Sequence, residues 1–370
     1  MTKYKKIIHD QIDSVIKEKI LELDINAYRL LETNHYFIIS ALLCYNVIDQ
    51  PVFRDNKAKN SITTITGNIA PYTSKNYYKT LYKELEKLAK QLKPLMQESD
   101  FFFNTVSVNG RLPDKKIAAV TGLGKYCKNS LIYHPEFGTM LILGEIVYSK
   151  QNKLSLTDFI RTVNRLFSTI KANDICHDCH KCIQACPTNA ITKFHRINRQ
   201  KCLQHLSSIF CTFGPAITQA WGRRLYGCTI CQDVCPLNKK VKTVKHKTEY
   251  GVVGKQFSLE KILQTPYTEQ KGLFKGNQIG AAWVSQMAIR RNAILALATY
   301  KTDEAVSMLQ KALLAEPVEL KPYIIQALTN IDNDKSRIFL ENQEHNAELP
   351  DYIREIISKK IKNSNKYYFL

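Results

Sequence analysis

The hydrophobic pattern of the first hundred residues predicts two helices and a buried strand between them. Residues 4–34 place apolar side chains at helical spacing, and residues 75–95 carry leucines every three or four positions beneath a lysine-rich outer face. Residues 36–45 form a short apolar run rich in aromatic and β-branched side chains, which is typical of a buried strand. Residues 47–70 contain proline, asparagine and glycine and are predicted to be a loop.

Shorter elements of both kinds follow as far as residue 171. The pattern predicts strands over residues 101–108, 130–133 and 139–147, and helices over residues 114–121 and 157–171. Because strands and helices alternate over residues 1–150, this part of the chain is predicted to form an α/β domain.

The C-terminal part of the chain has a helical pattern. Apolar faces rich in alanine, leucine and isoleucine recur over residues 290–298, 303–315 and 320–331. Paired helices of this length are typical of HEAT-like repeats. One or two such repeats cannot bury a core alone, so we expect them to pack on the rest of the protein. Residues 359–366 are rich in lysine and are expected to form a frayed tail.

Nine of the eleven cysteines fall within residues 176–235, and eight of them form two runs that are each followed by a proline, the second run beginning at Cys202. The first run has the spacing C-x2-C-x2-C-x3-C, and the second ends in C-x2-C-x3-C. This pattern is typical of two [4Fe–4S] clusters, in which the cysteine before the proline ligates the other cluster. The predicted ligands of the first cluster are Cys176, Cys179, Cys182 and Cys235. Those of the second are Cys186, Cys228 and Cys231, completed by Cys202.

Other uses of these cysteines fit the spacing less well. Disulfides need an oxidising compartment, which nothing in the chain suggests. Zinc sites commonly use two separated C-x2-C pairs rather than a run of three closed by a further cysteine and a proline. Cys211 lies between Cys202 and Cys228 and competes with Cys202 for the last ligand position. Cys44 lies on the predicted apolar strand and is expected to be a core residue.

Together these patterns predict three parts. Residues 1–155 form an α/β cofactor domain, residues 156–250 a ferredoxin-like module with two [4Fe–4S] clusters, and residues 251–370 an all-α HEAT-like region with a basic tail. A chain of 370 residues is long enough for two or three domains.

The charge balance indicates a polyanionic partner. Lys and Arg number 53 against 33 Asp and Glu, a net charge of +20. A surface this basic favours nucleic acid first and an acidic electron donor second, although a generally lysine-rich composition would also produce it. The longest mostly apolar run is too short to cross a bilayer. The first residues lack an apolar signal segment, so we expect a cytoplasmic protein.

Four stretches in this order resemble the epoxyqueuosine reductase family, over residues 35–335. They are Tyr72-Thr-Ser-Lys-Asn-Tyr-Tyr78, Leu112-Pro-Asp…Thr-Gly-Leu-Gly124 leading to Lys128-Asn129, the cysteine module ending in Tyr226-Gly-Cys…Cys-Pro-Leu-Asn238, and Arg291-Asn-Ala293. The cysteine module is the most specific of the four. The resemblance also favours Cys202 over Cys211 as a ligand.

The resemblance implies a particular chemistry. Members of the family bind a cobalamin against the N-terminal domain and use two [4Fe–4S] clusters to reduce its cobalt. They convert epoxyqueuosine to queuosine in tRNA. The implied partners are a tRNA anticodon stem-loop and a flavodoxin- or ferredoxin-type electron donor, with the protein a monomer. The residues implied to bind the cofactor are Tyr77, Gly122, Gly124, Cys127, Lys128 and Asn129.

The chain departs from the family pattern at three positions. Asn109 stands where the family carries an acidic proton donor, and an amide cannot act as a general acid. Asp114 is the nearest catalytic candidate. Tyr78 closes an Asn-Tyr-Tyr element that replaces Asp-Tyr-His, and Cys127 replaces a glycine. These departures leave two alternatives open: a diverged paralogue that transfers electrons without epoxide chemistry, and a corrinoid-linked reductase of a small molecule.

Overall fold

The computed structural model of the protein describes residues 3–47, 65–151, 153, 155–170, 175–192 and 196–365. The chain forms two compact units, neither of which is continuous in sequence. The first unit comprises Met1–Gln50, Pro71–Asn198 and Thr229–Val252. The second unit comprises Pro51–Ala70, Arg199–Cys228 and Val253–Leu370. The three-part division expected from the sequence remains a prediction.

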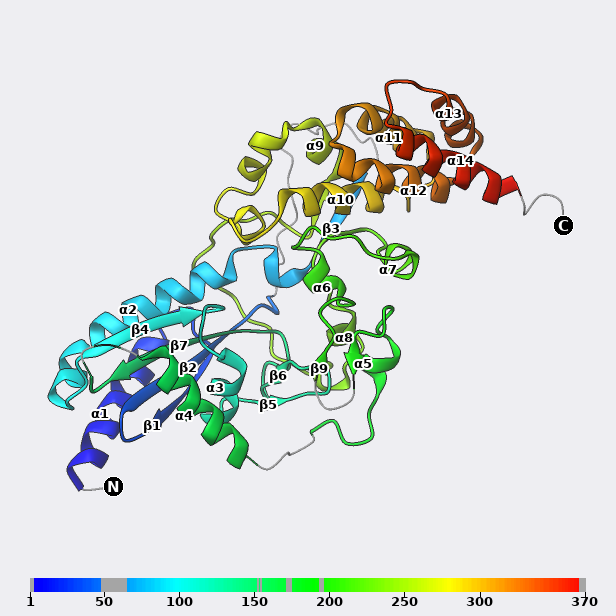
Figure 1. The fold of residues 1–370 in the computed structure, drawn as a ribbon. Helices are drawn as coiled ribbons and strands as arrows, with labels where there is room; N and C mark the ends of the chain where they lie inside the picture. The colour runs from blue at the N-terminus through cyan, green and yellow to red at the C-terminus, as the bar shows by residue number, and fades with distance from the viewer. Residues whose placement is uncertain are drawn as a thin grey trace. The chain divides into compact units, whose positions relative to one another are not determined.

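An antiparallel sheet of four strands forms the centre of the first unit, in the order β1-β2-β7-β4 (Figure 1). The strands are β1 (Ala27–Glu32), β2 (Tyr36–Cys44), β7 (Leu141–Ser149) and β4 (Phe103–Val108). Strand β2 is buried along its whole length, as its apolar sequence predicts. Strand β7 lies between β2 and β4, and pairs Glu145 with Ser40 on one side and Ser107 on the other.

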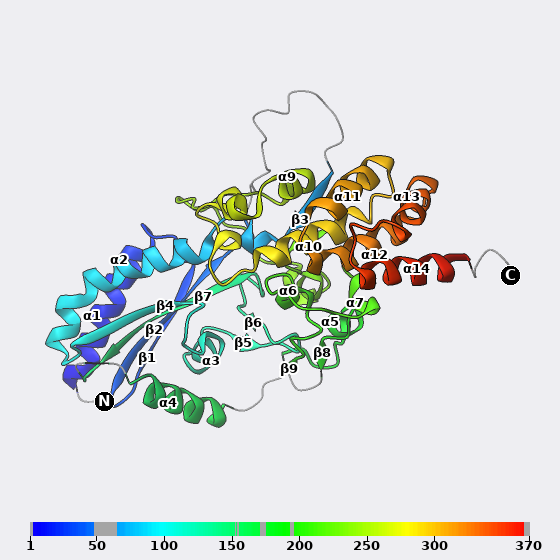
Figure 2. The same ribbon diagram turned by 45° about the horizontal axis from the view of Figure 1, so that its top comes forward.

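Helices cover both faces of this sheet (Figure 2). Helices α1 (Lys3–Ile20) and α2 (Tyr77–Glu98) contact each other, and α2 packs Leu81 and Leu85 against Gly144 of β7. Helices α3 (Asp114–Val120) and α4 (Leu156–Thr169) cover the other face, where Ile117 and Phe159 share an apolar cluster with Val147.

The first unit also holds short elements. They are η1 (Pro71–Thr73), β5 (Lys125–Tyr126), β6 (Ile132–Tyr133), α5 (Lys181–Gln184), β8 (Ile191–Thr192), β9 (Arg196–Ile197), α8 (Ile230–Asp233) and η2 (Pro236–Asn238). β5 pairs with β6, and β8 pairs with β9.

The second unit combines a small sheet with a group of helices. The sheet has the order β10-β3-β11. Its strands are β3 (Thr66–Ile69), β10 (Arg224–Tyr226) and β11 (Gln256–Ser258). The short helices are α6 (Leu203–Leu206), α7 (Pro215–Gln219), α9 (Leu259–Gln264), η3 (Tyr267–Phe274), η4 (Gln278–Gly280) and η5 (Val318–Leu320). The longer ones are α10 (Gln286–Leu297), α11 (Asp303–Ala315), α12 (Lys321–Ile331), α13 (Asp334–Glu344) and α14 (Asp351–Asn365). Helix α10 is almost entirely buried and packs against α9, α12 and β10.

The structure corrects three expectations. The predicted helix over residues 4–34 ends at Ile20, because residues 27–32 pair with β2 as a strand. The predicted loop over residues 47–70 contains strand β3, and its residues 48–64 lie outside the described part. The expected frayed tail is helical as far as Asn365, since α14 buries Ile353 and Ile357 on one face.

Candidate functional site

The four predicted ligands of the first cluster all belong to the first unit and lie close together. Cys176 and Cys179 share a turn in which the Cys179 N–H donates to the Cys176 carbonyl over 2.8 Å. Cys182 lies on α5 and Cys235 directly follows α8, and these two helices contact each other. Burial, together with the sulfurs of the other three cysteines, raises the pKa of the Cys182 thiol to about 11. Iron binding would relieve this repulsion; the assignment of the four cysteines to one cluster remains a prediction.

The four cysteines predicted to bind the first cluster do not have to surround a single metal ion. Among the described residues, no three His, Cys, Asp or Glu side chains are arranged to hold a single metal ion. A cubane does not need that arrangement, because each of its four irons takes its own cysteine sulfur.

A buried polar network fixes the segment that carries Cys235. The Gln232 side-chain amide donates to the Thr139 carbonyl over 2.7 Å, and the Tyr45 hydroxyl donates to its oxygen over 2.9 Å. The Asn238 amide donates to the Gln232 carbonyl and accepts the Thr139 N–H, each over 2.9 Å. Buried polar side chains that are all satisfied in this way are rigid. The network therefore holds Cys235 in place from both sides.

The glycine turn predicted to bind a cofactor follows α3. Gly122 has a φ of 77°, a left-handed conformation that glycine adopts without strain. Gly124 lies so close to the β5–β6 hairpin that an added Cβ would stand 2.7 Å from the Tyr133 carbonyl oxygen. The sequence therefore needs glycine at both positions.

The rest of this turn lies against the cysteine loops. The Lys128 N–H donates to the Cys176 sulfur over 3.4 Å, and the Asn129 side chain donates to the Cys231 carbonyl over 3.4 Å. Cys127 is buried, and burial followed by the nearby Cys176 raises the pKa of its thiol. The structure thus brings Cys127 and Lys128 to Cys176, a predicted ligand of the first cluster, and Asn129 to Cys231, a predicted ligand of the second.

The two tyrosines at the start of α2 have different surroundings. Tyr77, a predicted cofactor residue, is fully buried, with its ring against Tyr45 and His246. Tyr78 is half-buried, and burial followed by the charge of Asp114 raises the pKa of its phenol to about 12. Tyr78 rather than Tyr77 therefore lies beside the predicted catalytic residue.

Asp114 lies beside a second carboxyl that sequence reasoning missed. One Asp114 oxygen accepts the N–H of Asn109 over 3.0 Å, and Asn109 itself has a left-handed φ of 52°. The Glu145 carboxyl is completely buried, and burial followed by the neighbouring Asp114 raises its pKa well above the usual value. The sequence feature that could have indicated Glu145 is that it is the single carboxylate within the apolar stretch 141–149.

The predicted ligands of the second cluster are divided between the units. Cys186 and Cys231 belong to the first unit, and Cys202 and Cys228 to the second. Burial favours the neutral form of the Cys186 thiol, but hydrogen bonds such as the 3.3 Å bond from the Ala190 N–H outweigh it and lower the pKa. The assignment of these four cysteines to one cluster remains a prediction.

Within the second unit, Arg291 and Asn292 of α10 join the segments that carry Cys202 and Cys228. The fully buried Arg291 guanidinium donates to the Leu206 carbonyl over 2.6 Å and to the Ile209 and Cys211 carbonyls over 3.2 Å. The Asn292 amide donates to the carbonyls of Ser207 and Leu225 over 2.9 Å. We call this pair the α10 clamp. The sequence marked the pair as part of a motif but did not indicate its contacts.

An aromatic cage completes the α10 clamp. The Arg291 guanidinium lies 4.6 Å from the centre of the Phe213 ring, and Phe213 stacks on Trp221 at 5.3 Å. Cation–π contacts of this kind are strongest where water is excluded. The cage therefore surrounds the charged group with aromatic rings.

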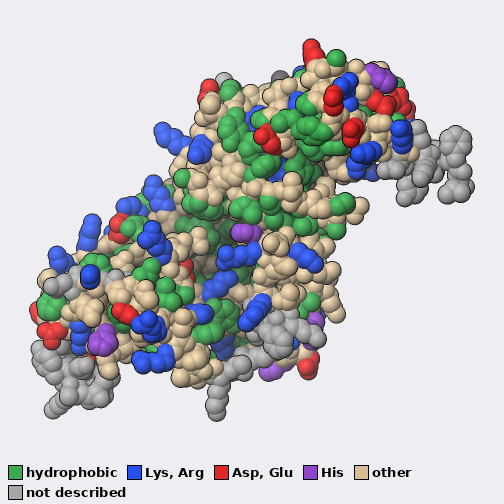
Figure 3. Space-filling model, viewed as in Figure 1, with side chains coloured by type: hydrophobic (Ala, Val, Ile, Leu, Met, Phe, Trp, Pro, Cys, Tyr) green, Lys and Arg blue, Asp and Glu red, His purple; other side chains and the backbone are tan. Residues whose placement is uncertain are grey.

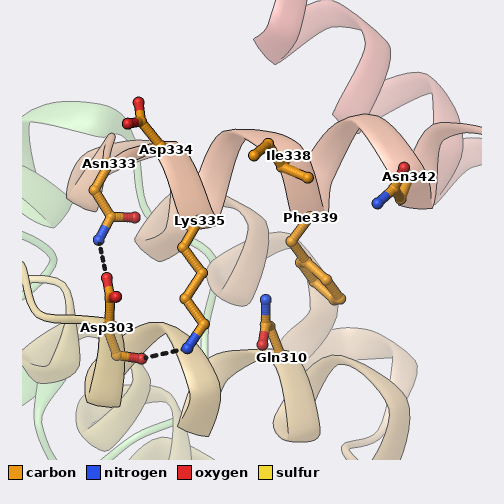
Figure 4. Close-up of a pocket in the computed structure, with 8 residues that line it drawn as sticks. All are labelled: Asp303, Gln310, Asn333, Asp334, Lys335, Ile338, Phe339 and Asn342. Carbon is orange, nitrogen blue, oxygen red and sulfur yellow. Dashed lines mark hydrogen bonds between the residues drawn. The ribbon is translucent and has the colours of Figure 1, made fainter.

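A hollow of about 590 Å³ opens on the C-terminal helices (Figure 4). Lys335 of α13 reaches toward α11 and donates to the Asp303 carbonyl, while the Asn333 side chain donates to the Asp303 carboxylate over 2.9 Å. Its lining includes Phe339 but none of the predicted site residues. The hollow therefore does not enter the site.

Basic side chains are numerous on the first unit. Figure 3 shows Lys and Arg side chains spread over the region of α2. The exposed lysines of that helix are Lys79, Lys83, Lys87, Lys90 and Lys93. Within the described part of the chain, no helix has both the length and the apolar character that crossing a membrane requires.

Known proteins share the cysteine module and the fold. A family model described as a 4Fe-4S double cluster binding domain matches residues 175–238. The epoxyqueuosine reductase of Bacillus subtilis is 30% identical over 245 residues, which cover 66% of this chain and 58% of that protein. The epoxyqueuosine reductase of Staphylococcus aureus is 27% identical over 283 residues, covering 76% of this chain and 70% of that protein.

Solved structures agree. The B. subtilis epoxyqueuosine reductase, solved with its catalytic aspartate loop swung out of the active site, matches with a TM-score of 0.67 at 25% identity, over 88% of this chain and 81% of that one. The chain is therefore similar to epoxyqueuosine reductases in sequence and in fold. A further epoxyqueuosine reductase, solved with a tRNA-Tyr epoxyqueuosine-modified stem loop, matches in fold with a TM-score of 0.75 at 22% identity, over 96% of this chain and 99% of that one.

The similarity to epoxyqueuosine reductases gives Asn109 its significance. The B. subtilis relative has a catalytic aspartate loop, and the sequence resemblance puts an amide at the corresponding position of this chain. The matched part spans 58% of the length of that relative. The nearest acid to Asn109 in the described structure is Asp114, to which its N–H is bonded.

Glu145→Gln is expected to weaken the pH dependence of the stability of this protein. Because the pKa of Glu145 is raised, the folded protein keeps a proton that the unfolded chain releases above about pH 4.3. Stability therefore falls as pH rises toward the folded pKa, by up to about 1.4 kcal/mol per pH unit. Urea unfolding of anaerobic protein between about pH 5.5 and pH 8.5 should give a steeper decline for the wild type than for the variant. If the unfolding free energies of the wild type and the variant changed equally with pH, Glu145 would not have a raised pKa in the folded protein.

Proposed function

We propose that this chain reduces the epoxide of epoxyqueuosine in tRNA to give queuosine, using two [4Fe–4S] clusters and a cobalamin. The overall reaction takes up two electrons and two protons and releases the epoxide oxygen as water. The observation that carries the proposal is the 3.4 Å hydrogen bond from Lys128 of the glycine turn to the Cys176 sulfur. It joins the predicted cofactor turn to a predicted cluster ligand.

The chain's cysteines would hold the clusters. Cys176, Cys179, Cys182 and Cys235 would ligate the first, and Cys186, Cys202, Cys228 and Cys231 the second. Clusters held by cysteine pass single electrons at potentials set by hydrogen bonds to their sulfurs. The Lys128 N–H would lower the energy of the reduced first cluster in this way.

The glycine turn would bind the corrin. Gly122 and Gly124 leave the backbone uncovered by side chains, so that a flat macrocycle could approach it closely. Lys128 and Asn129 anchor the same turn to the cysteine loops. A bound cobalamin would supply the reducing chemistry at the epoxide, while the protein orients it.

Asp114 would donate a proton to the oxygen of the opening epoxide. It is half-buried and next to Tyr78, and its raised pKa favours the protonated form that a general acid needs. Burial is the main cause of that raised pKa. Asp114 would thus take the role that Asn109 cannot perform.

The substrate would reach the protein as part of a folded RNA. The exposed lysines of α2 and the net charge of +20 support contacts to RNA phosphates. A solved relative that holds an epoxyqueuosine-modified stem loop supports the same class of ligand. Electrons would come from a flavodoxin- or ferredoxin-type donor, the helices α10–α14 would act as HEAT-like repeats, and the protein would be a monomer in the cytoplasm.

Asn109 is the observation that favours a second candidate function. A paralogue without epoxide chemistry would need the cluster cysteines and the α10 clamp but neither a corrin nor an acid. Corrinoid binding therefore separates the two functions.

We expect anaerobically purified protein to contain about eight irons per chain and to retain cob(II)alamin on gel filtration. Gly124→Ala should abolish retention, because the added methyl group meets the Tyr133 carbonyl oxygen and deforms the turn. Gly214→Ala is the matched control, since a Cβ there meets nothing within 4 Å and the backbone has an ordinary φ of −71°.

Equal retention by both glycine variants would place the corrin elsewhere. No retention by the wild type, with both clusters intact, would exclude the cobalamin mechanism and leave an electron-transfer protein.

A further inference from the structure

Glu145 occupies an unusual place for a carboxylic acid. It lies at the centre of β7, between Ser40 of β2 and Ser107 of β4, and none of its surface is exposed. Val147 and Leu143, two residues away on either side and on the same face of the strand, belong to the apolar clusters beneath α3. A charged carboxylate in such an apolar layer destabilises the fold unless hydrogen bonds or an opposite charge compensate for the lost hydration.

The hydrogen bonds around Glu145 do not supply that compensation. Within the described part of the chain, neither Glu145 oxygen has a hydrogen-bond partner that could donate to it, nor does the completely buried Ser40 hydroxyl opposite have a partner there. Asp114 lies within hydrogen-bonding reach of Glu145. One Asp114 oxygen takes the Asn109 N–H, while the other is buried without a donor.

Two carboxylates can meet in this way only if a proton lies between them. Ionised carboxylates are acceptors only, whereas a protonated one donates an O–H. Two like charges at contact in a low dielectric hold one proton strongly, as in known carboxyl dyads. Among the described residues no group of His, Cys, Asp and Glu could hold a metal ion here instead. One shared proton gives the buried Asp114 oxygen and one Glu145 oxygen a hydrogen bond to each other.

The pair has an inner and an outer member. Glu145 is completely buried, whereas Asp114 is partly exposed at the start of α3. The other titratable groups that act on the pair are Tyr78 of α2 and Lys115, the next residue of α3. Asp114 is thus the member that a substrate could touch, and Glu145 the one that water cannot reach.

We propose that Asp114 and Glu145 share one proton and that Asp114 passes it to the epoxide oxygen, in place of the acid that the family carries at the position of Asn109. The proposal rests on the proposed function. In the step, the Asp114 O–H bond breaks as the proton bonds to the epoxide oxygen and the first C–O bond opens. The second C–O bond breaks as the C=C bond forms, and the oxygen leaves as water with the second proton. The two electrons come from the low-potential donor through the clusters, and the second proton comes from water. Solvent returns a proton to the pair through Asp114 before the next turnover.

Glu145 acts in this scheme as a positioning residue for Asp114. Removing its acidity leaves Asp114 beside a neutral amide, which would donate to Asp114 and stabilise its ionised form. The protonated fraction of Asp114 at neutral pH therefore falls. The reaction should then need a lower pH, which a purely structural role for Glu145 would not produce.

The test combines a spectrum with a rate profile. Infrared spectra of the anaerobic wild type in water and deuterated water should contain the carbonyl band of one buried protonated carboxyl at neutral pH. Glu145→Gln, which keeps the shape of the side chain, should lose that band. Its single-turnover rate of queuosine formation should fall about 100-fold at neutral pH and recover toward lower pH. Glu145→Asp, which keeps the acid, should retain the band and part of the rate.

Each outcome decides the proposal. Absence of the band in the wild type would overturn the shared proton. A band together with an unchanged rate and pH profile in Glu145→Gln would overturn the role in proton transfer. A band in a wild type that forms no queuosine would refute the proposed function and its proton step, while leaving the shared proton established. Circular dichroism confirms that each variant is folded.

Discussion

Asp114→Asn is expected to slow queuosine formation by about 10²- to 10⁴-fold, the usual effect of removing a general acid. An amide cannot donate a proton to the epoxide oxygen, and Asn109 beside it is already an amide. The measurement is the single-turnover rate with corrinoid-loaded protein and tRNA that contains epoxyqueuosine. Iron content and corrinoid retention should be unchanged, because Asp114 contacts no predicted ligand.

Asn109→Asp provides the matched gain of function. Asn109 has a left-handed φ of 52°, which aspartate tolerates as well as asparagine does. The new carboxyl would stand where the family carries its acid. The double variant Asn109→Asp/Asp114→Asn should therefore regain much of the rate that Asp114→Asn alone loses. A full rate in Asp114→Asn itself would show that the proton comes from elsewhere.

Arg291→Met is expected to remove the second cluster and to destabilise the second unit. The substitution removes the Arg291 donor from the carbonyls of Leu206 and Ile209, whereas the Cys211 carbonyl keeps the Tyr323 hydroxyl at 3.0 Å. Each buried unsatisfied group costs about 1–3 kcal/mol, so the two together should cost about 2–6 kcal/mol. The segment after Cys202 would keep the Asn292 bond to Ser207 but lose its bonds to Arg291. Iron analysis should fall from about eight toward about four irons per chain.

Arg337→Met is the control for that experiment. Arg337 is half-exposed on α13 and pairs with Asp332 and Asp334 at the surface. Such pairs contribute about 0–1 kcal/mol, so iron content should not change. Full iron content and unchanged electron paramagnetic resonance of the reduced clusters in Arg291→Met would contradict the role of the α10 clamp.

The parts of the fold that depend on local pattern could be predicted from the sequence. The apolar run of β2 and the leucine spacing of α2 are found where they were expected. Strand β1 was not predicted. Its residues 27–32 are only partly buried, and they form a strand because they pair with β2. The helical C-terminus was not predicted, because the many lysines of residues 359–366 suggested a frayed tail. The helix that continues through them is held by two buried isoleucines further upstream, Ile353 and Ile357.

In the candidate site, too, the local features could be predicted from the sequence and the long-range contacts could not. The cysteine spacing and the glycine turn are local features, whereas the contact between Cys176 and the turn is seen only in the structure. Glu145 and Arg291 act on residues far away in sequence, so no spacing rule finds them. The Asp114–Glu145 pair depends on sheet register and on the packing of α3, which a linear pattern does not contain.

The central claim is that this chain reduces an epoxide in tRNA, and one measurement tests it most directly. Anaerobic wild-type protein, loaded with cobalamin, is mixed with a low-potential reductant and with tRNA that contains epoxyqueuosine, and the nucleosides are then analysed by mass spectrometry. The account predicts that queuosine replaces epoxyqueuosine over several turnovers. Unchanged epoxyqueuosine, with both clusters and the corrinoid present, would contradict it.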